Sequence, residues 1–134
     1  MHSHILIPVA IDHEGRVSQK IAVARQMLAP GGRITLLTVL EQIGGFVSEF
    51  VTVKSENHLS DKIRERLQSA ADGDDIAVEV TTGKPGVEIA RFARSRACDL
   101  IVVGSHAPGQ SEYRLGSTAA SVVRSAACSV YVLR

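Results

Sequence analysis

Short apolar runs alternate along this chain with longer segments in which apolar residues recur every three or four positions. The short runs are rich in Ile, Val, Leu and Thr and predict strands, whereas the longer spacing predicts amphipathic helices. The expected strands cover 4–11, 33–40, 76–82, 99–103 and 129–133, and the expected helices cover 18–29, 55–71, 85–97 and 117–127. Strands and helices therefore alternate along the sequence.

Three of the predicted helices carry a clear apolar stripe that is suited to packing on a sheet. The stripes consist of Val17, Ile21, Ala24 and Leu28 in the first helix, Leu59, Ile63, Leu67 and Ala70 in the second, and Ala119, Val122, Val123 and Ala126 in the last. The other face of the second helix is charged, which is typical of a face turned to solvent. These helices are therefore expected to cover a sheet.

Glycine and proline mark where several elements should begin or end. The Pro-Gly-Gly segment at 30–32 is expected to stop the first helix, and Pro85 suits the first turn of the third. The segment 41–54 contains a Gly-Gly pair and is predicted to be a loop, with a short extra strand over 46–53 as the alternative.

Continuous apolar strands joined by helices predict a parallel sheet that is covered on both faces. The expected fold is α/β, a doubly wound, Rossmann-like domain with a five-stranded parallel sheet. Right-handed crossovers leave few strand orders, and 3-2-1-4-5 is favoured over 2-1-3-4-5. Pro8 lacks the N–H that a central strand needs, so it is expected near the end of the first strand, where strands 1 and 4 separate.

The bulk properties fit a single domain over residues 1–134. Hydrophobic residues make up 45% of the chain, and 15 Lys and Arg against 14 Asp and Glu leave a net charge of +1. That balance argues against a broad basic surface for nucleic acid or an anionic membrane. No apolar run reaches the roughly 20 residues of a membrane helix and no basic leader is visible, so a cytoplasmic location is expected.

The cysteines and histidines do not predict a metal site. Cys98 and Cys128 have neither the spacing of a metal knuckle nor the number for a disulfide framework, and they are expected to be reduced and largely buried. The remaining candidates, His2, His4, His13 and His58, also lack metal-ligand spacing.

In an open parallel sheet, ligands bind beyond the carboxyl ends of the strands, where the winding direction reverses. For the order 3-2-1-4-5 this point lies between strands 1 and 4. The residues expected there are Ala10, Ile11 and Asp12 after strand 1, Val103, Gly104, Ser105 and His106 after strand 4, and Val39 as the neighbouring wall. Asp12 suits an adenine edge or a ribose hydroxyl, with a turn-forming role as the alternative.

The connection 104–116 is long for a loop between a strand and a helix, and such loops tend to be functional. It ends in Gly116, Ser117 and Thr118 directly before a helix. Glycine allows close approach of a ligand, Ser or Thr serves as an N-cap, and the free N–H groups suit phosphate. Ordinary capping is the alternative reading. The sharper GxxxxGK[ST] and GxGxxG patterns are both missing from the sequence.

These residues resemble the universal stress protein family over essentially the whole chain. The matching segments are 5–12 (Ile-Leu-Ile-Pro-Val-Ala-Ile-Asp), 36–39 (Leu-Leu-Thr-Val), 98–106, and 116–124 through to 128–134. ATP-binding members carry Gly, two residues, Gly, nine residues, then Gly-Ser or Gly-Thr. Here Ala107 replaces the second glycine and eight residues separate it from Gly116, which resembles a sub-branch of short members with a Gly-Ser-His-x-Pro loop.

The resemblance implies a site for ATP or AMP, with any Mg²⁺ or Mn²⁺ held mainly by the phosphates. Asp12 and the backbone of Val39 would meet adenine, and Val103 and Gly104 would line the ribose. The phosphate contacts would come from Gly116, Ser117 and Thr118, with Gly109 taking over part of the second glycine's role. The resemblance also implies a homodimer that pairs through the last strand, 130–133.

Three functions remain open at this point. The first is a homodimeric stress-response sensor or regulator that binds an adenine nucleotide. The second is a nucleotide-independent dimeric interaction protein of the same fold, which Ala107 and the short loop favour. The third is a weak ATPase or autophosphorylating enzyme, for which His106 and Glu112 are the candidate bases. For His106, hydrogen bonding in the loop or to a phosphate is favoured over acid–base chemistry, Arg114 could offset phosphate charge, and Lys84 is expected to lie far from the site.

Overall fold

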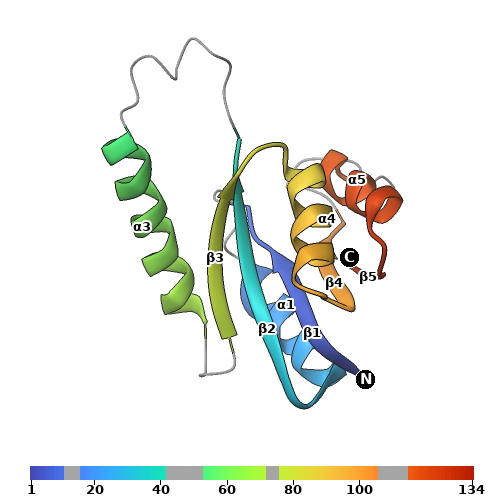
Figure 1. Ribbon diagram of the computed structural model, residues 1–134. Coiled ribbons are helices and arrows are strands. Elements are labelled where there is room, and N and C mark those ends of the chain that lie inside the picture. The colour runs from blue at the N-terminus through green and yellow to red at the C-terminus, as the bar shows by residue number, and fades with distance from the viewer. Residues whose placement is uncertain (11–15, 42–52, 72–75, 106–114) are drawn as a thin grey trace.

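The computed structural model describes residues 1–10, 16–41, 53–71, 76–105 and 115–134. Its sheet contains β1 (His2–Pro8), β2 (Leu28–Leu40), β3 (Ile76–Thr82), β4 (Leu100–Gly104) and β5 (Ser129–Leu133). The strand order is β3-β2-β1-β4-β5, and each neighbouring pair is parallel (Figure 1). The predicted fold class and strand order are therefore confirmed, with β1 at the centre.

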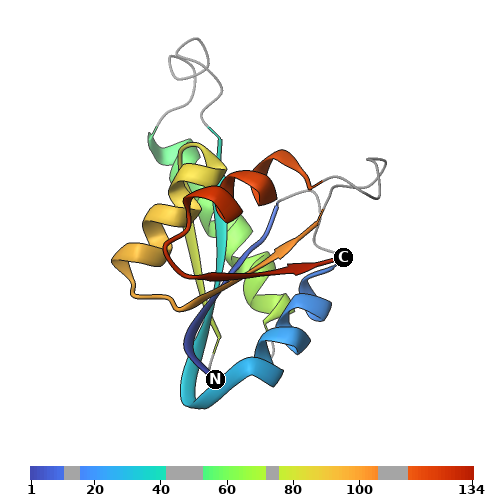
Figure 2. The ribbon, with the colours of Figure 1, turned by 90° about the vertical axis from the view of Figure 1, so that its right-hand side faces the viewer.

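Helices cover both faces of the sheet. The described helices are α1 (Val17–Met27), α3 (Val53–Ala70), α4 (Pro85–Ser95) and α5 (Ser117–Ser125). One apolar cluster joins α1 and α3 to the sheet, and a second joins α4 and α5 to its opposite face (Figures 1 and 2). This division follows from strand alternation, because successive side chains of one strand point to opposite faces.

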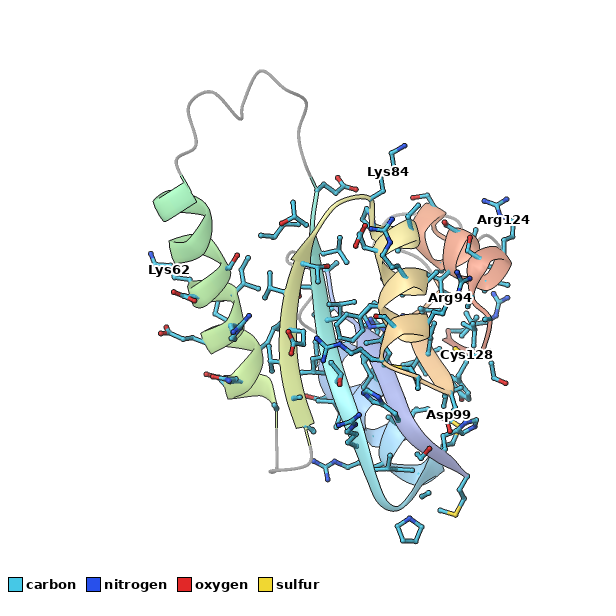
Figure 3. All side chains as sticks on the ribbon, in the orientation of Figure 1. Lys62, Lys84, Arg94, Asp99, Arg124 and Cys128 are labelled. Atoms are coloured by element: carbon cyan, nitrogen blue, oxygen red, sulfur yellow. The ribbon has the colours of Figure 1, made fainter. Side chains whose placement is uncertain are left out.

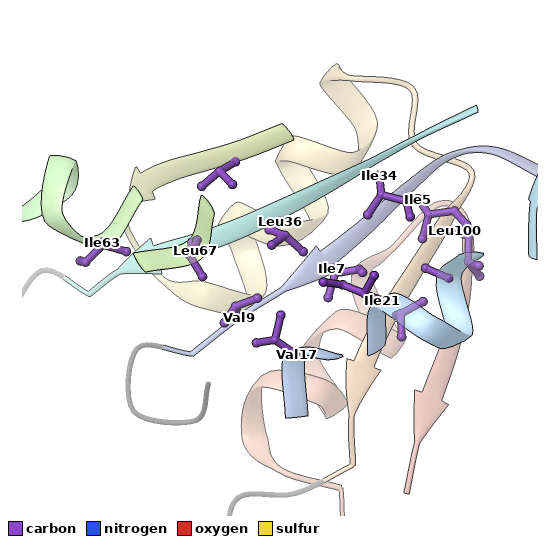
Figure 4. Close-up of a cluster of buried hydrophobic side chains, with 13 residues drawn as sticks. Ile5, Ile7, Val9, Val17, Ile21, Ile34, Leu36, Ile63, Leu67 and Leu100 are labelled. Atoms are coloured by element: carbon purple, nitrogen blue, oxygen red, sulfur yellow. The ribbon is translucent and has the colours of Figure 1, made fainter. Parts of the chain in front are cut away.

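The central strand shows that alternation directly. Ile5 and Ile7 belong to the cluster under α1 and α3, which Figure 4 draws, whereas Leu6 belongs to the cluster under α4 and α5. All of these side chains are fully buried. A strand that is apolar on both faces requires helices on both, so the continuous apolar run near the amino terminus accounts for the layered fold.

Two strands extend beyond the predicted bounds at the amino-terminal edge of the sheet. β1 begins at His2 and β2 begins at Leu28, because His2 pairs with Leu28 while His4 pairs with Arg33. The Pro-Gly-Gly segment 30–32 therefore lies in an irregular stretch of β2, with Gly31 at a φ of 79°, and not in a turn after a helix. The first helix accordingly ends at Met27, earlier than predicted.

Other bounds also differ from the predictions. β1 ends at Pro8 and not at 11, which confirms that Pro8 lies at a strand end. α4 stops at Ser95, and Ala97 follows with a φ of 54° that an α-helix cannot contain. α5 ends at Ser125, and Val123 is 44% exposed and so falls outside its buried stripe. β3 and β5 match their predicted bounds.

The second predicted helix begins at Val53, two residues earlier than expected from the predicted start at 55. Ile63 and Leu67 of its stripe are buried, as predicted. Residues 42–52, which contain the rest of the predicted loop, lie outside the described residues. Within the described part of the chain, no helix is long and apolar enough to cross a membrane.

Candidate functional site

The central strands β1 and β4 stop pairing with each other before their carboxyl ends. Their pairing runs through Ile5–Leu100 and Leu6–Ile101, whereas β1 stays paired with β2 as far as Pro8–Leu37. The N–H of Val9 then donates to the Leu37 carbonyl oxygen at 2.8 Å, which carries β1 along β2 a residue further. We call the region between Pro8–Ala10 and Gly104–Ser105 the strand split. It lies where the sheet reverses its winding direction, as predicted.

At the strand split, side chains donate hydrogen bonds to the carbonyl oxygens at the end of β1. The hydroxyl of Thr38 donates to the Val9 carbonyl oxygen at 3.0 Å, on the β2 side. The C=O of Pro8 points the opposite way from the N–H of Val9, because the two belong to one trans peptide. It therefore faces β4, and the ammonium of Lys20 donates to it at 3.3 Å.

Lys20 is the fourth residue of α1, at the end of its first turn, and reaches both central strands. A Cβ atom added to Gly104 would lie 3.5 Å from Cε and 3.7 Å from Nζ of Lys20. Removal of the amine from water, together with the positive charge of Arg16, holds the pKa of Lys20 below its ordinary value. Among the residues that the structure describes, no carboxylate lies within ion-pair distance of Lys20. The strand split thus holds a cation without a described counter-charge.

Hydrogen bonds fix the start of α5 beside the end of β4. The N–H of Ser105 donates to the Leu133 carbonyl oxygen at 2.9 Å, so β5 extends the pairing past Gly104. The carbonyl oxygen of Ser105 in turn accepts from the N–H of Gly116 at 2.6 Å. Ser105 is fully buried. The bond between Ser105 and Gly116 joins the two ends of the connection between β4 and α5. It involves only backbone atoms.

The first turn of α5 differs from the prediction in its cap. Gly116 occupies the N-cap position with extended backbone angles, and this residue has no side chain with which to cap the helix. Ser117 and Thr118 are therefore helical residues rather than caps, and both side chains are exposed. The first N–H groups of a helix have no acceptor within it. Since the N-cap residue offers them no hydroxyl, the amides at this end suit an anionic ligand.

The structure brings together most of the described candidates. Those at or beside the strand split are Ala10, Val103, Gly104, Ser105, Gly116, Ser117 and Thr118. Val39 lies on β2, where its side chain packs against the α4 and α5 cluster. Lys84 follows β3 and is the N-cap residue of α4 (Figure 3). The predicted Ile11, Asp12, His106 and Gly109, together with Ala107, Glu112 and Arg114, lie outside the described residues.

Lys20 was not among the residues predicted from the sequence. It lies three residues after Val17 and directly before Ile21, so it borders the stripe that faces the sheet. A lysine beside the buried stripe, in the first helix after the central strand, was the available signal. A role for Lys20 could not be predicted from this signal, because a single lysine on a helix most often belongs to a solvated face.

The histidines and cysteines at the amino-terminal edge of the sheet serve the fold. Buried His4 contacts the Arg96 carbonyl oxygen through Nδ1 at 3.1 Å and the Thr35 hydroxyl through Nε2 at 2.8 Å. Cys98 is buried, and burial raises its pKa to about 11, while Cys128 is half-buried. Both thiols are free, as predicted, and no His, Cys, Asp or Glu cluster among the described residues could hold a metal ion.

The fold is a doubly wound, Rossmann-like α/β domain, and the sequence comparisons give its family. The model of the universal stress protein family matches residues 1–134, and the chain belongs to this family. Universal stress protein G of Shigella flexneri is 32% identical over 145 aligned positions, which span both chains completely.

Solved structures share the fold. Universal stress protein UspA of Lactobacillus plantarum superposes with a TM-score of 0.71 and 25% identity, over 98% of this chain and 97% of that one. A universal stress protein of Archaeoglobus fulgidus, solved in complex with dAMP, gives 0.58 and 16%, over 97% and 96%. A universal stress protein solved in complex with cAMP gives 0.64 and 17%, over 99% and 97%.

Proposed function

We propose that this protein binds an adenine nucleotide at the strand split and acts as a homodimeric sensor or regulator in a stress response. The observation that carries the proposal is the uncapped first turn of α5, which the bond between Gly116 and Ser105 holds beside the end of β4. Family members have been solved with cAMP and with dAMP, which supports an adenine nucleotide as the ligand class.

Each part of the nucleotide has candidate contacts. The N–H groups and hydroxyls of Ser117 and Thr118, with the backbone of Gly116, would hold the phosphates of ATP or AMP. Val103 and Gly104 would line the ribose, while Asp12 and the backbone of Val39 would meet adenine. Phosphate oxygens would supply most of the ligands of a bound Mg²⁺ or Mn²⁺ ion.

The proposed homodimer uses β5. This strand is at the edge of the sheet, so pairing with β4 leaves its other edge available to a second copy. Tyr131 on β5 is 39% exposed, which adds apolar surface to that edge strand. An exposed apolar edge strand promotes association, and two copies related by a two-fold axis would close it.

A nucleotide-independent interaction protein of the same fold is the alternative. Ala107 stands where the ATP-binding family pattern has its second glycine, and the loop that follows is one residue short of that pattern. A protein of this kind would keep the fold and the dimer without the ligand.

Isothermal titration of the purified protein with ATP, AMP and adenosine, with and without Mg²⁺, separates these functions. Binding of ATP or AMP, accompanied by a rise in Tm at millimolar nucleotide, is the expected result, because a ligand that binds only the folded state stabilises it. No heat and no change in Tm with any of the three ligands would favour the nucleotide-independent protein.

A further inference from the structure

The amine of Lys20 occupies the point at which the central strands separate. In a continuous parallel pair, an N–H of β4 would donate to the carbonyl oxygen of Pro8. Because that pairing has already ended at Leu6–Ile101, the ammonium of Lys20 bonds this oxygen instead, at 3.3 Å. The side chain crosses from α1 to the carboxyl end of the sheet, which is the edge where ligands of such sheets bind.

Among the described residues, the charge that acts on this amine is a second cation. Besides desolvation, Arg16, the N-cap residue of α1, lowers the pKa of Lys20, and no described carboxylate of α1, β1, β2 or β4 pairs with Lys20. Within the described part of the chain, this partly desolvated ammonium bonds a neutral carbonyl, which compensates its charge incompletely. An anion placed beside it would supply the missing counter-charge.

The amine of Lys20 also lies close to the backbone of β4. Gly104 has no side chain, and the position of its missing Cβ lies 3.7 Å from Nζ of Lys20. An ammonium carries three N–H donors, so Lys20 can keep its bond to Pro8 while it donates to a ligand. The uncapped turn of α5 begins beside the same strand end, through the Ser105–Gly116 bond.

We propose that Lys20 recognises the negative charge of the ligand, so that the strand split binds nucleoside phosphates in preference to the neutral nucleoside. This inference rests on the proposed nucleotide site and adds its selectivity to it. The ammonium bonds an anionic oxygen of the ligand from the α1 side of the sheet, and the amides of α5 bond the phosphate from the other side.

The test compares AMP with adenosine in Lys20→Met, which keeps the side chain as far as Cε and removes the charged amine. Lys62→Met, on the exposed face of α3 (Figure 3), is the matched control. We expect Lys20→Met to raise the Kd for AMP by about tenfold or more, as for a lost bond to a charged group, and the Kd for adenosine by less than about twofold. Lys62→Met should change neither value.

A second variant keeps the test decisive if Lys20→Met unfolds. Lys20→Gln is neutral but retains a donor for the Pro8 carbonyl, and it should lose the preference for AMP in the same way. An unchanged ratio of the two Kd values in a folded, nucleotide-binding variant would overturn the role of Lys20 and leave the nucleotide site standing. If the unsubstituted protein binds neither AMP nor ATP, the proposed function itself fails.

Discussion

The ammonium of Lys20 lies 3.3 Å from the carbonyl oxygen of Pro8, the last residue of the central strand. This contact joins a proline that the sheet tolerates only at a strand end to a lysine that sequence reasoning overlooked. Proline contributes no N–H to the ladder, and its carbonyl faces the gap that opens toward β4. The strand split is therefore built into β1, and Lys20 occupies it.

Removing the N–H of residue 117 tests the anion site on α5 without changing the helix. In Ser117→Pro the ring fits the first helical position, and the extended angles of Gly116 (φ −61°, ψ 161°) suit a residue before proline. We expect an increase in the Kd for ATP of about tenfold, with little change in stability. Ser117→Ala, which removes only the hydroxyl, is the control, and equal binding by Ser117→Pro and the unsubstituted protein would exclude this amide as a ligand.

Adding a methyl group at residue 104 tests the space beside Lys20. The new Cβ would meet Cε of Lys20 at 3.5 Å, an ordinary contact, so Gly104→Ala should change the free energy of unfolding by less than about 0.5 kcal/mol. The methyl group would still narrow the strand split, and we expect AMP to bind several-fold more weakly by titration. A large loss of stability in urea would instead show that the methyl group disturbs the strand itself.

The contact between α4 and α5 depends on a glycine. A Cβ on Gly86 would lie 2.5 Å from Cβ of Ser121, closer than two side chains can pack. Gly86→Ala should therefore destabilise the protein by about 1–3 kcal/mol in urea unfolding, although alanine is the better helix former. Ser121→Gly in the same chain should recover most of this loss. Stabilisation by Gly86→Ala alone would contradict the packing.

Buried His4 predicts how stability varies with pH. Desolvation lowers the pKa of His4, despite the opposing bond to the Arg96 carbonyl, so the unfolded chain binds the proton more tightly than the folded one. Stability from this residue is therefore present above about pH 6.5 and is lost as the pH falls through the lower, folded value. Urea unfolding between about pH 7.5 and pH 5 should show a shallower decline in His4→Asn than in the unsubstituted protein. Parallel curves would contradict the prediction.

Asp99 contributes in a separate and more acidic range. Partial burial opposes ionisation of its carboxylate, but hydrogen bonds from the N–H groups of Ser3 and His4 outweigh it and lower the pKa of Asp99. The stability that these bonds give is present above about pH 4 and is lost below it. The pH dependence of stability can therefore be compared between His4→Asn and the unsubstituted protein above about pH 4 without a contribution from Asp99.

The edge strand β5 predicts the oligomeric state. We expect a dimer of twice the 14.3 kDa chain mass, measured by light scattering after gel filtration. Tyr131→Lys places a charge on the exposed side chain of β5 and should yield the monomer. Val87→Lys, at a 49% exposed position on α4, is the control and should remain a dimer. A monomer in the unsubstituted protein, or a dimer in Tyr131→Lys, would contradict the proposed β5 interface.

Periodicity alone predicted most of the fold. The bounds of β3 and β5 and the strand order follow from apolar runs joined by amphipathic helices. The start of β2 could not be found in this way, because Pro30 and Gly31 normally signal a turn, whereas β2 already begins at Leu28, which pairs with His2. Long-range pairing of that kind has no local signal.

The residues of the candidate site also differ in whether they have a local sequence signal. Gly104 and Gly116 could be located because glycines at the ends of a strand and before a helix form a recognisable pattern. The N-cap was misassigned by one residue, since Ser and Thr are favoured caps but here begin the helix itself. Lys20 needed the tertiary structure, because its role arises from where β1 and β4 separate.

The central claim is that an adenine nucleotide binds across the strand split. A crystal structure of the protein grown with millimolar AMP tests it most directly. We expect density for AMP at the carboxyl ends of β1 and β4, with its phosphate within hydrogen-bond distance of the amides of Ser117 or Thr118 and of Nζ of Lys20. A saturated crystal with this edge of the sheet empty, or with AMP bound elsewhere, would contradict the account.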